Sequence, residues 1–215
     1  MSRDSQTTNN QTTRNQTIYT QSTSTAILVM AAGKSSRFGA DKRQALIDGK
    51  TMLQTTLDNA SPWKESIRVV LTPKDKDLQS TLAAQHIKTY VAPNAQHGMG
   101  HSLADAIQQL AKNEPNISHC LVLLADMPFL KTGTLQTLLD ALETNDLIVP
   151  VHQGQRGNPV GFGRRYFPAL MELSGDKGGK VVLQSNEQSV LEITVDDAGV
   201  LKDIDQPEQI SGLTV

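Results

Sequence analysis

The stretch from residue 26 to Lys42 has the composition of a phosphate-binding loop. Apolar residues fill positions 26–31, and Gly33, Arg37 and Lys42 follow in a short polar segment. Backbone N–H groups at such a turn, together with a planar guanidinium and a compact ammonium, can surround the charged oxygens of a triphosphate. The spacing matches neither G-x-x-x-x-G-K-[ST] nor G-x-G-x-x-G, which argues against a P-loop NTPase and against a dinucleotide-binding fold.

A carboxylate stands at the end of a second apolar run. Residues 121–124 are aliphatic, Asp126 follows after one alanine, and Pro128 prevents simple continuation of a β-ladder. An aspartate at the tip of a buried strand can hold Mg²⁺ against the phosphates of a nucleotide. Aspartate is also common as a helix cap or turn residue, so this segment alone leaves both interpretations open.

The elements that would position these residues alternate along the chain. Apolar runs predict buried strands at 26–31, 67–72, 87–92, 120–125 and 147–151. Apolar residues at helical spacing lie between most of them, at 52–57, 103–110 and 135–142. This alternation predicts an α/β protein with βαβ units and a mostly parallel open sheet. Ligands bind beyond the carboxyl ends of the strands in such sheets, and both loops described above fall there.

The composition of the sequence changes after residue 150. Glycine and proline become frequent, and short strands are predicted at 159–162, 190–195 and 199–203. We interpret this part as an insertion and edge structure that covers one end of the sheet, rather than as a separate domain.

Composition limits the class of protein. The 215 residues have a net charge of about −2, which gives no general basic surface for nucleic acid. No stretch predicts a membrane span or a secretory signal, and the lone cysteine, Cys120, fits the core of a cytoplasmic protein. Residues 1–24 are rich in Gln, Thr, Asn and Ser and predict a disordered tail, which leaves 25–215 as the folded domain.

Three motifs resemble those of one enzyme family. The loop from Ala31 to Lys42 reads A-A-G-x-S-x-R-F-G-x-x-K and resembles the signature loop of the MobA-like nucleotidyltransferases, most closely the molybdenum cofactor cytidylyltransferases (MocA type). The A-D-M-P segment at 125–128 and the D-I-D-x-P-E segment at 203–208 resemble the metal-site segments of that family. The resemblance covers roughly 26–212 and implies a Rossmann-like three-layer sandwich of the nucleotide-diphospho-sugar transferase type.

The resemblance also implies a reaction, in which CMP passes from CTP to molybdopterin or the molybdenum cofactor and pyrophosphate is released. The cofactor would be Mg²⁺ or Mn²⁺, and a molybdoenzyme or its maturation factor would be a partner. Arg37, Lys42 and Asp126 take the catalytic roles, and Asp126 and Asp205 hold the metal. Asp203 is the reserve ligand, since Asp205 also suits a helix N-cap.

Substrate contacts are carried over position by position. The nucleotide-binding residues implied in this way are Ala31, Ala32, Gly33, Ser35, Ser36, Arg37, Lys42, Asn94, Gly98, Met99 and Ser102. An R-G-x-P segment and a G-D-x-G segment resemble the family's acceptor side and imply acceptor contacts from Arg156, Asn158 and Asp176.

Simpler interpretations of these residues stay open. Asn94 and Ser102 can cap a helix, and Asp176 can cap the helix expected through residues 181–183. His97 and His101 are four residues apart, but without a third ligand they are weak candidates for a metal site.

Two other functions remain open at this stage. A guanylyltransferase, or an enzyme that uses a sugar or alcohol phosphate, would keep the same fold and the same triphosphate loop. A carrier that delivers the molybdenum cofactor without transferring anything would not need a complete metal and triphosphate site, so the residues disfavour it.

Overall fold

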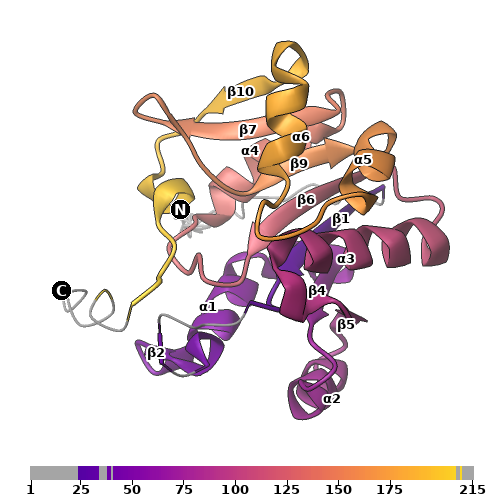
Figure 1. Cartoon of the computed structure of the whole chain (residues 1–215). Coiled ribbons are helices and arrows are strands. Elements are labelled where there is room, and N and C mark those ends of the chain that lie inside the picture. Colours follow the sequence, from indigo (N-terminus) through magenta and orange to yellow (C-terminus); the bar gives the residue numbers. More distant parts are fainter. Residues whose placement is uncertain (1–23, 34–37, 40, 207–208, 210–215) are drawn as a thin grey trace, which may run out of the picture.

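The computed structural model of the chain describes residues 24–33, 38–39, 41–206 and 209. Its main feature is an eight-stranded sheet in the order β10-β7-β9-β6-β1-β4-β5, with β8 paired to β7 (Figure 1). The strands are β1 (Thr25–Met30), β4 (Ile67–Leu71), β5 (Lys88–Val91), β6 (His119–Leu124), β7 (Leu147–His152), β8 (Gln155–Arg156), β9 (Val160–Gly163) and β10 (Leu191–Thr194). A separate hairpin joins β2 (Leu46–Ile47) and β3 (Lys50–Thr51).

The sheet is mostly parallel, as the sequence predicts. Strands β5, β4, β1 and β6 run parallel, and β10 runs parallel to β7. The exceptions are β8, which is antiparallel to β7, and β9, which lies between β6 and β7 and is antiparallel to both. The expectation of a purely peripheral insertion after residue 150 is therefore wrong for β9, because Phe162 is fully buried and pairs with Cys120 on one side and Leu147 on the other.

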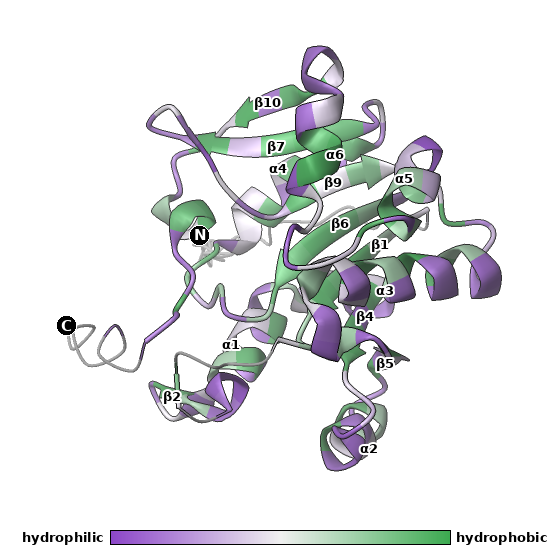
Figure 2. Cartoon of the chain, viewed as in Figure 1, coloured by the Kyte–Doolittle hydropathy of each residue, from purple (hydrophilic) through white to green (hydrophobic). Residues whose placement is uncertain are grey.

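Helices cover both faces of the sheet. They are α1 (Met52–Asn59), α2 (Lys76–Ala84), α3 (Met99–Asn113), α4 (Thr132–Leu142), α5 (Phe167–Met171) and α6 (Lys180–Ser185). Alternate residues of β1 enter two apolar clusters, one shared with α3, α5 and α6 and the other with α1, α2 and α4. Figure 2 shows the hydrophobic strands between these helices, with hydrophilic residues along the outer face of α3. The result is the three-layer arrangement predicted from the sequence.

Short 3₁₀ turns complete the connections. They are η1 (Lys42–Gln44), η2 (Ser61–Ser66), η3 (Ala95–His97), η4 (Arg164–Tyr166), η5 (Glu187–Ser189) and η6 (Ala198–Leu201). The strand predicted at 199–203 is wrong, because the buried Asp197 side chain accepts a hydrogen bond of 2.8 Å from the Gly199 amide and starts η6 instead. The same carboxylate accepts from the Lys131 amide at 2.9 Å, which ties η6 to the start of α4.

The parallel pairing of β1 and β6 brings the two loops of interest together. Met30 stands opposite Leu124 at the ends of these strands, and the Ala125 amide donates to the Met30 carbonyl at 3.2 Å. Residues 31–33 and 125–128 therefore leave the sheet side by side at its carboxyl edge. Within the described part of the chain, no helix has the length and apolarity that a membrane crossing requires. The predicted tail lies, up to residue 23, outside the described residues.

Candidate active site

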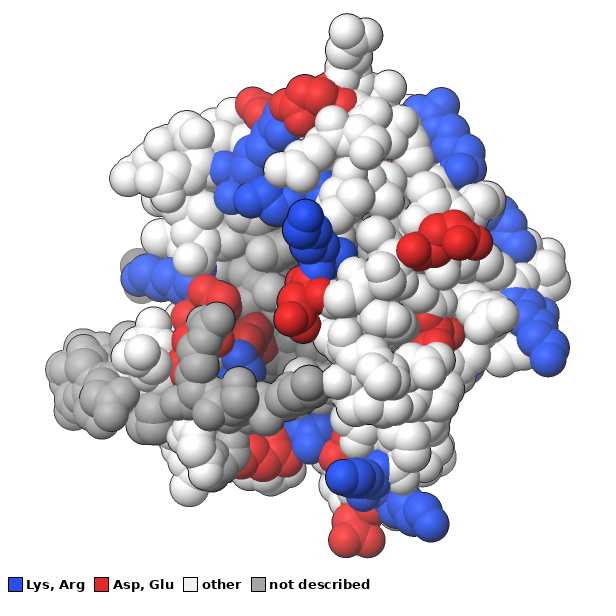
Figure 3. All heavy atoms as spheres, viewed as in Figure 1, with Lys and Arg blue, Asp and Glu red and all other residues white. Residues whose placement is uncertain are grey.

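A cavity of about 490 Å³ opens at the carboxyl ends of β1 and β6. Its described lining consists of Met30, Ala31, Ala32, Gly33, Phe38, Lys42, Arg43, Met52, Ala95, Gly98, Met99, Ser102, Leu124, Ala125, Asp126, Asp176, Asp203 and Asp205. Figure 3 shows acidic and basic side chains gathered around the hollow on this face of the molecule. This mixture of small residues, cations and carboxylates suits a charged, phosphate-bearing ligand.

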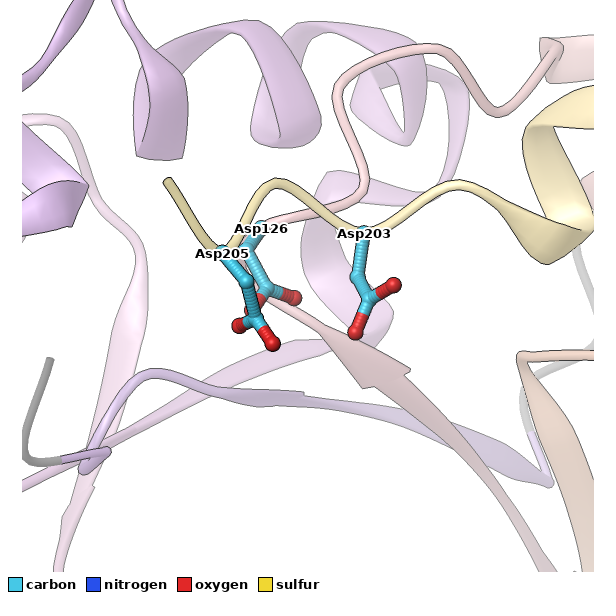
Figure 4. A group of neighbouring side chains, drawn as sticks. All are labelled: Asp126, Asp203 and Asp205. Atoms are coloured by element: carbon cyan, nitrogen blue, oxygen red, sulfur yellow. The ribbon is translucent and has the colours of Figure 1, made fainter. Parts of the chain in front are cut away.

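Three carboxylates meet in this cavity (Figure 4). One oxygen of each of Asp126, Asp203 and Asp205 lies within 4.8 Å of the others. Asp126 follows β6 after Ala125, while the other two belong to the segment after η6. The Ile204 amide donates to the Asp126 carbonyl at 3.1 Å, and the Ile204 side chain is buried against Ile47 and Met52. Since side chains alternate along an extended segment, burial of Ile204 turns Asp203 and Asp205 to the cavity side.

The ammonium of Lys42 lies among these carboxylates. It donates to Asp126 Oδ2, to Asp205 Oδ1 at 3.2 Å and to the Ile204 carbonyl at 3.4 Å. Burial alone would lower the pKa of Lys42, but its pairing with Asp126 and Asp205 outweighs burial and raises it. Burial also raises the pKa of Asp126, against the opposing attraction of Lys42. Among the described residues, the ammonium of Lys42 thus pairs with two of the three carboxylates, Asp126 and Asp205.

The donor set fits a hard divalent cation. Asp126 Oδ1 is fully buried and has no hydrogen-bond partner among the described residues. A buried carboxylate oxygen without a donor is costly unless a cation satisfies it. Mg²⁺ and Mn²⁺ favour carboxylate oxygens, and Asp203 and Asp205 supply two more beside it. Asp205, predicted as the second metal ligand, and Asp203, the reserve candidate, therefore lie together beside Asp126.

Arg43 supports the loop that carries Lys42. Its guanidinium donates to the Ala31 carbonyl at 2.8 Å, to both oxygens of Asp41 at 2.8 Å and to Asp75 Oδ1 at 2.6 Å. Burial would raise the pKa of Asp75, but hydrogen bonds from Arg43 and Thr72 outweigh it and hold that pKa below its usual range. Arg43 thereby joins the end of β1, the start of η1 and the loop after β4.

The predicted nucleotide contacts divide into three groups. The structure brings six of them to the cavity besides Lys42, namely Ala31, Ala32, Gly33, Gly98, Met99 and Ser102. Ser35, Ser36 and Arg37 lie outside the described residues. Asn94 lies outside the cavity lining, because its backbone and side-chain nitrogens both donate to Asp105, at 2.9 and 3.0 Å. Its nucleotide role remains a prediction.

Among the predicted acceptor contacts, only Asp176 lies in the described cavity lining. Arg156 is exposed and paired to Glu187 and Glu192, with its Nε 2.6 Å from Glu192 Oε1. The Asn158 amide donates to the Val200 carbonyl at 2.8 Å. Acceptor roles for Arg156 and Asn158 remain predictions, while no described side chain, Asp176 included, caps α6 by a hydrogen bond.

Some lining residues were not predicted. They are Met30, Phe38, Arg43, Met52, Ala95, Leu124 and Ala125, with Asp203 named only as a reserve. Phe38 belongs to the R-F-G motif and Arg43 directly follows Lys42. A position within or next to a motif could therefore have identified these two residues as part of the site. Apolar strand ends such as Met30 and Leu124 carry no such signal.

Known proteins resemble this chain over most of its length. "Purine catabolism protein PucB" of Bacillus subtilis (strain 168) is 29% identical over 191 residues, which cover 84% of this chain and 91% of PucB. "Bifunctional protein GlmU" of Trichormus variabilis is 30% identical over 142 residues, which are 64% of this chain but only 30% of GlmU.

Solved structures extend the resemblance to the fold. Rv0371c from Mycobacterium tuberculosis superposes with a TM-score of 0.76 at 25% identity, over 90% of this chain and 98% of that one. A manganese complex of Rv0371C superposes with a TM-score of 0.71 at 24% identity, over 89% of this chain and all of that one. Residues 27–190 match the MobA-like NTP transferase domain, and the chain therefore belongs to the MobA-like nucleotidyltransferase family.

Proposed function

We propose that this nucleotidyltransferase transfers CMP from CTP to molybdopterin or the molybdenum cofactor, with Mg²⁺ or Mn²⁺ at the three carboxylates. The observation that carries the proposal is the buried Asp126 Oδ1, which has no hydrogen-bond partner in the part of the chain that the structure describes and lies beside Asp203 and Asp205. The resemblance of the motifs at 31–42, 125–128 and 203–208 to MocA-type enzymes supports the choice of CTP and of a pterin acceptor.

The chain's own residues would bind and orient the reactants. The loop amides of 31–33 and the ammonium of Lys42 would contact the phosphates, and the start of α3 at Gly98 and Met99 would contact the nucleoside. All of these residues line the cavity. Asp126, Asp203 and Asp205 would hold the divalent cation, which when bound offsets phosphate charge that the carboxylates alone would repel.

The reaction needs no strong protein base. A terminal phosphate oxygen of the acceptor, already anionic near neutral pH, would form a bond to the α-phosphorus of CTP. The bond from that phosphorus to the bridging oxygen of the β-phosphate breaks, and its electron pair leaves with pyrophosphate. Lys42 would stabilise the charge that develops on the phosphates, once binding of the reactants has drawn its ammonium from the carboxylates.

The partner and the location are part of the same proposal. A product of this kind would pass to a molybdoenzyme or its maturation factor. The single cysteine, Cys120, is fully buried, and burial raises the pKa of its thiol, which favours an inert core residue of a cytoplasmic enzyme.

The first experiment is calorimetric titration with CTP, GTP, ATP and UTP, with and without Mg²⁺, followed by pyrophosphate release in the presence of molybdopterin. The proposal expects metal-dependent preference for CTP and pyrophosphate release that requires the pterin. Preference for GTP would assign the guanylyl reaction instead. Binding of the pterin without pyrophosphate release from any nucleotide would indicate a carrier.

Asp126→Asn and Asp77→Asn provide a matched pair for that assay. Both changes replace a carboxylate by an amide, but Asp77 is exposed in the first turn of α2, away from the cavity lining. Loss of metal-dependent binding in the Asp126 variant alone would support the carboxylate site. Equal binding in both variants would contradict it.

A further inference from the structure

The loop at residues 174–178 is seated on the first turn of α3. The Gly100 amide donates to the Gly175 carbonyl at 2.8 Å. Gly98, at φ +119°, has no room for a side chain, because a Cβ there would lie 2.4 Å from both the Gly175 carbonyl oxygen and Asp176 Oδ1. We call this contact between the loop at 174–178 and the first turn of α3 the seam. Asp176 and Met99 both line the cavity, so the seam brings the predicted acceptor side and the predicted nucleoside side into contact.

His101 supplies the second hydrogen bond of the seam. The Gly175 amide donates to His101 Nδ1 at 3.0 Å. The His97 carbonyl oxygen lies 3.1 Å from the same ring nitrogen. Because the Gly175 amide can only donate, we assign Nδ1 as its acceptor and place the ring proton on Nε2, whereas a proton on Nδ1 would be donated to His97 instead. His101 thus acts here as a hydrogen-bond acceptor for the backbone, a role that the His97–His101 spacing does not reveal.

Both backbone groups of Gly175 are consequently held by α3. This glycine has a left-handed conformation with φ +65°, and the direction of the chain at Asp176 depends on it. The two hydrogen bonds, one accepted from the Gly100 amide and one donated to His101, fix that conformation where the loop borders the cavity. Only the bond to His101 depends on a side chain.

We propose that His101 is a positioning residue, which acts through the Gly175 amide to hold Asp176 at the cavity beside Gly98 and Met99. The proposal rests on the proposed function for its kinetic consequence, namely placement of the acceptor relative to the nucleotide. Loss of the hydrogen-bond acceptor at position 101 should loosen the loop at 174–178, which borders the predicted site of the acceptor substrate. The triphosphate loop and the carboxylates should stay in place.

The test compares His101→Leu with His101→Asn, using His97→Leu as a control. Leucine removes the acceptor, whereas the asparagine side-chain oxygen can replace Nδ1. His97 is the neighbouring ring, 5.4 Å away between centroids, and its Nε2 lies 3.2 Å from the Gln96 side-chain nitrogen. All three variants keep the backbone bond between Gly100 and Gly175.

Hydrogen exchange of the Gly175 amide in the free protein is the first measurement. The Leu variant should exchange about fivefold faster than wild type, as expected from loss of one hydrogen bond, and the Asn and His97 variants should exchange at the wild-type rate. Tryptic cleavage after the exposed Lys177 should accelerate in the Leu variant alone. Unchanged exchange in the Leu variant, or acceleration that Asn does not restore, would overturn the proposal.

Steady-state kinetics separate positioning from general damage. The Leu variant should raise the KM for the acceptor about fivefold and leave nucleotide affinity within twofold of wild type, since one hydrogen bond is lost on the acceptor side alone. A parallel loss for both substrates would indicate a structural role and overturn the proposal. If the wild-type protein transfers nothing to any acceptor, the proposed function fails, and the exchange measurement still decides whether His101 holds the loop.

Discussion

The ammonium of Lys42 contacts Asp126, 84 residues further along the chain, and both side chains are largely buried, at 16% and 14% exposure. This ion pair joins the loop after β1 to the loop after β6. The same ammonium reaches Asp205, so one lysine joins the loop after β1 to both segments that carry the carboxylates. In the ligand-free chain, Lys42 thus provides part of the positive charge that the carboxylates need.

Asp126→Asn should abolish metal-dependent transfer and leave the fold intact. The amide removes the negative charge at the buried Oδ1 position but keeps the shape of the side chain, and Lys42 retains Asp205 as a partner. Titration with Mn²⁺ should show at least tenfold weaker binding, of the order seen for loss of one metal-site group, with a thermal midpoint within about 4 °C of wild type. Full Mn²⁺ affinity in this variant would place the cation elsewhere.

Lys42→Met should impair transfer more than metal binding. Removal of a cation that stabilises charge in the transition state costs about 2–4 kcal/mol of barrier, or roughly 30- to 1000-fold in kcat. Mn²⁺ affinity should be equal to or higher than that of wild type, because the ammonium no longer occupies the space between Asp126 and Asp205. Exposed Lys76, changed to Met, is the control. Undiminished kcat in the Lys42 variant would refute its catalytic role.

Arg43 and Asp75 should be energetically coupled. Their side chains are 13% and 12% exposed, and a terminal guanidinium nitrogen of Arg43 lies 2.6 Å from Asp75 Oδ1, so solvent screens the pair weakly. A double-mutant cycle with Arg43→Gln and Asp75→Asn should give a coupling of about 1.5–3 kcal/mol in the free energy of unfolding from urea denaturation. Strictly additive effects of the two changes would show that the pair does not support the loop.

The apolar runs of the sequence were sufficient to predict the central strands. Residues 26–31 are buried throughout, and so are 120–125 apart from the partly buried Leu124, which makes each apolar run continuous on both faces and places Asp126 just beyond a strand end. Helix α2 went unpredicted because Leu82 is its one buried residue, so its sequence carries little helical periodicity. The local sequence pattern thus predicts elements that bury much apolar surface and misses those that bury little.

Pairing order and side-chain partners were less predictable. Nothing in residues 159–162 indicates insertion between β6 and β7, because a short apolar run predicts a buried strand but not the strands with which it pairs. Arg156 looked available for an acceptor phosphate, yet Glu187 and Glu192, more than thirty residues away, hold its guanidinium. Partners of this kind depend on the tertiary fold and leave no trace in local spacing.

Gly98→Ala should disrupt the seam between α3 and the loop at 174–178. The backbone conformation at φ +119° is costly for a residue with a Cβ, by about 1–3 kcal/mol, and the methyl group would collide with the Gly175 carbonyl. Acceptor-dependent turnover and the thermal midpoint should both fall. Gly133→Ala in α4, where a Cβ meets nothing within 4 Å, should instead stabilise the protein by about 0.5–1 kcal/mol. Normal stability and turnover of Gly98→Ala would contradict the close approach at this seam.

A second charged network gives the folded protein a predictable dependence on acid. Glu114, at the C-terminal end of α3, accepts from Arg68 Nε at 2.8 Å and also contacts Tyr90 and Lys88. Its hydrogen bond with Arg68 lowers the pKa of Glu114 from 4.5 to about 2, against burial, which would raise it. Since the folded-state pKa is the lower one, this carboxylate stabilises the fold above about pH 4.5, and the stabilisation is lost as pH falls towards about 2.

Glu114→Gln should therefore destabilise the protein at neutral pH and progressively less in acid. At pH 7 the buried Arg68 loses its charged partner, and the free energy of unfolding should fall by about 1–3 kcal/mol. Between about pH 4.5 and pH 2 the deficit should shrink, because wild-type Glu114 becomes protonated as well. Urea denaturation at several pH values measures this difference, with Glu143→Gln, an exposed residue after α4, as the control. If the deficit in the free energy of unfolding stayed constant down to about pH 2, the variant would have lost packing contacts only, and the charge of Glu114 would not contribute to stability.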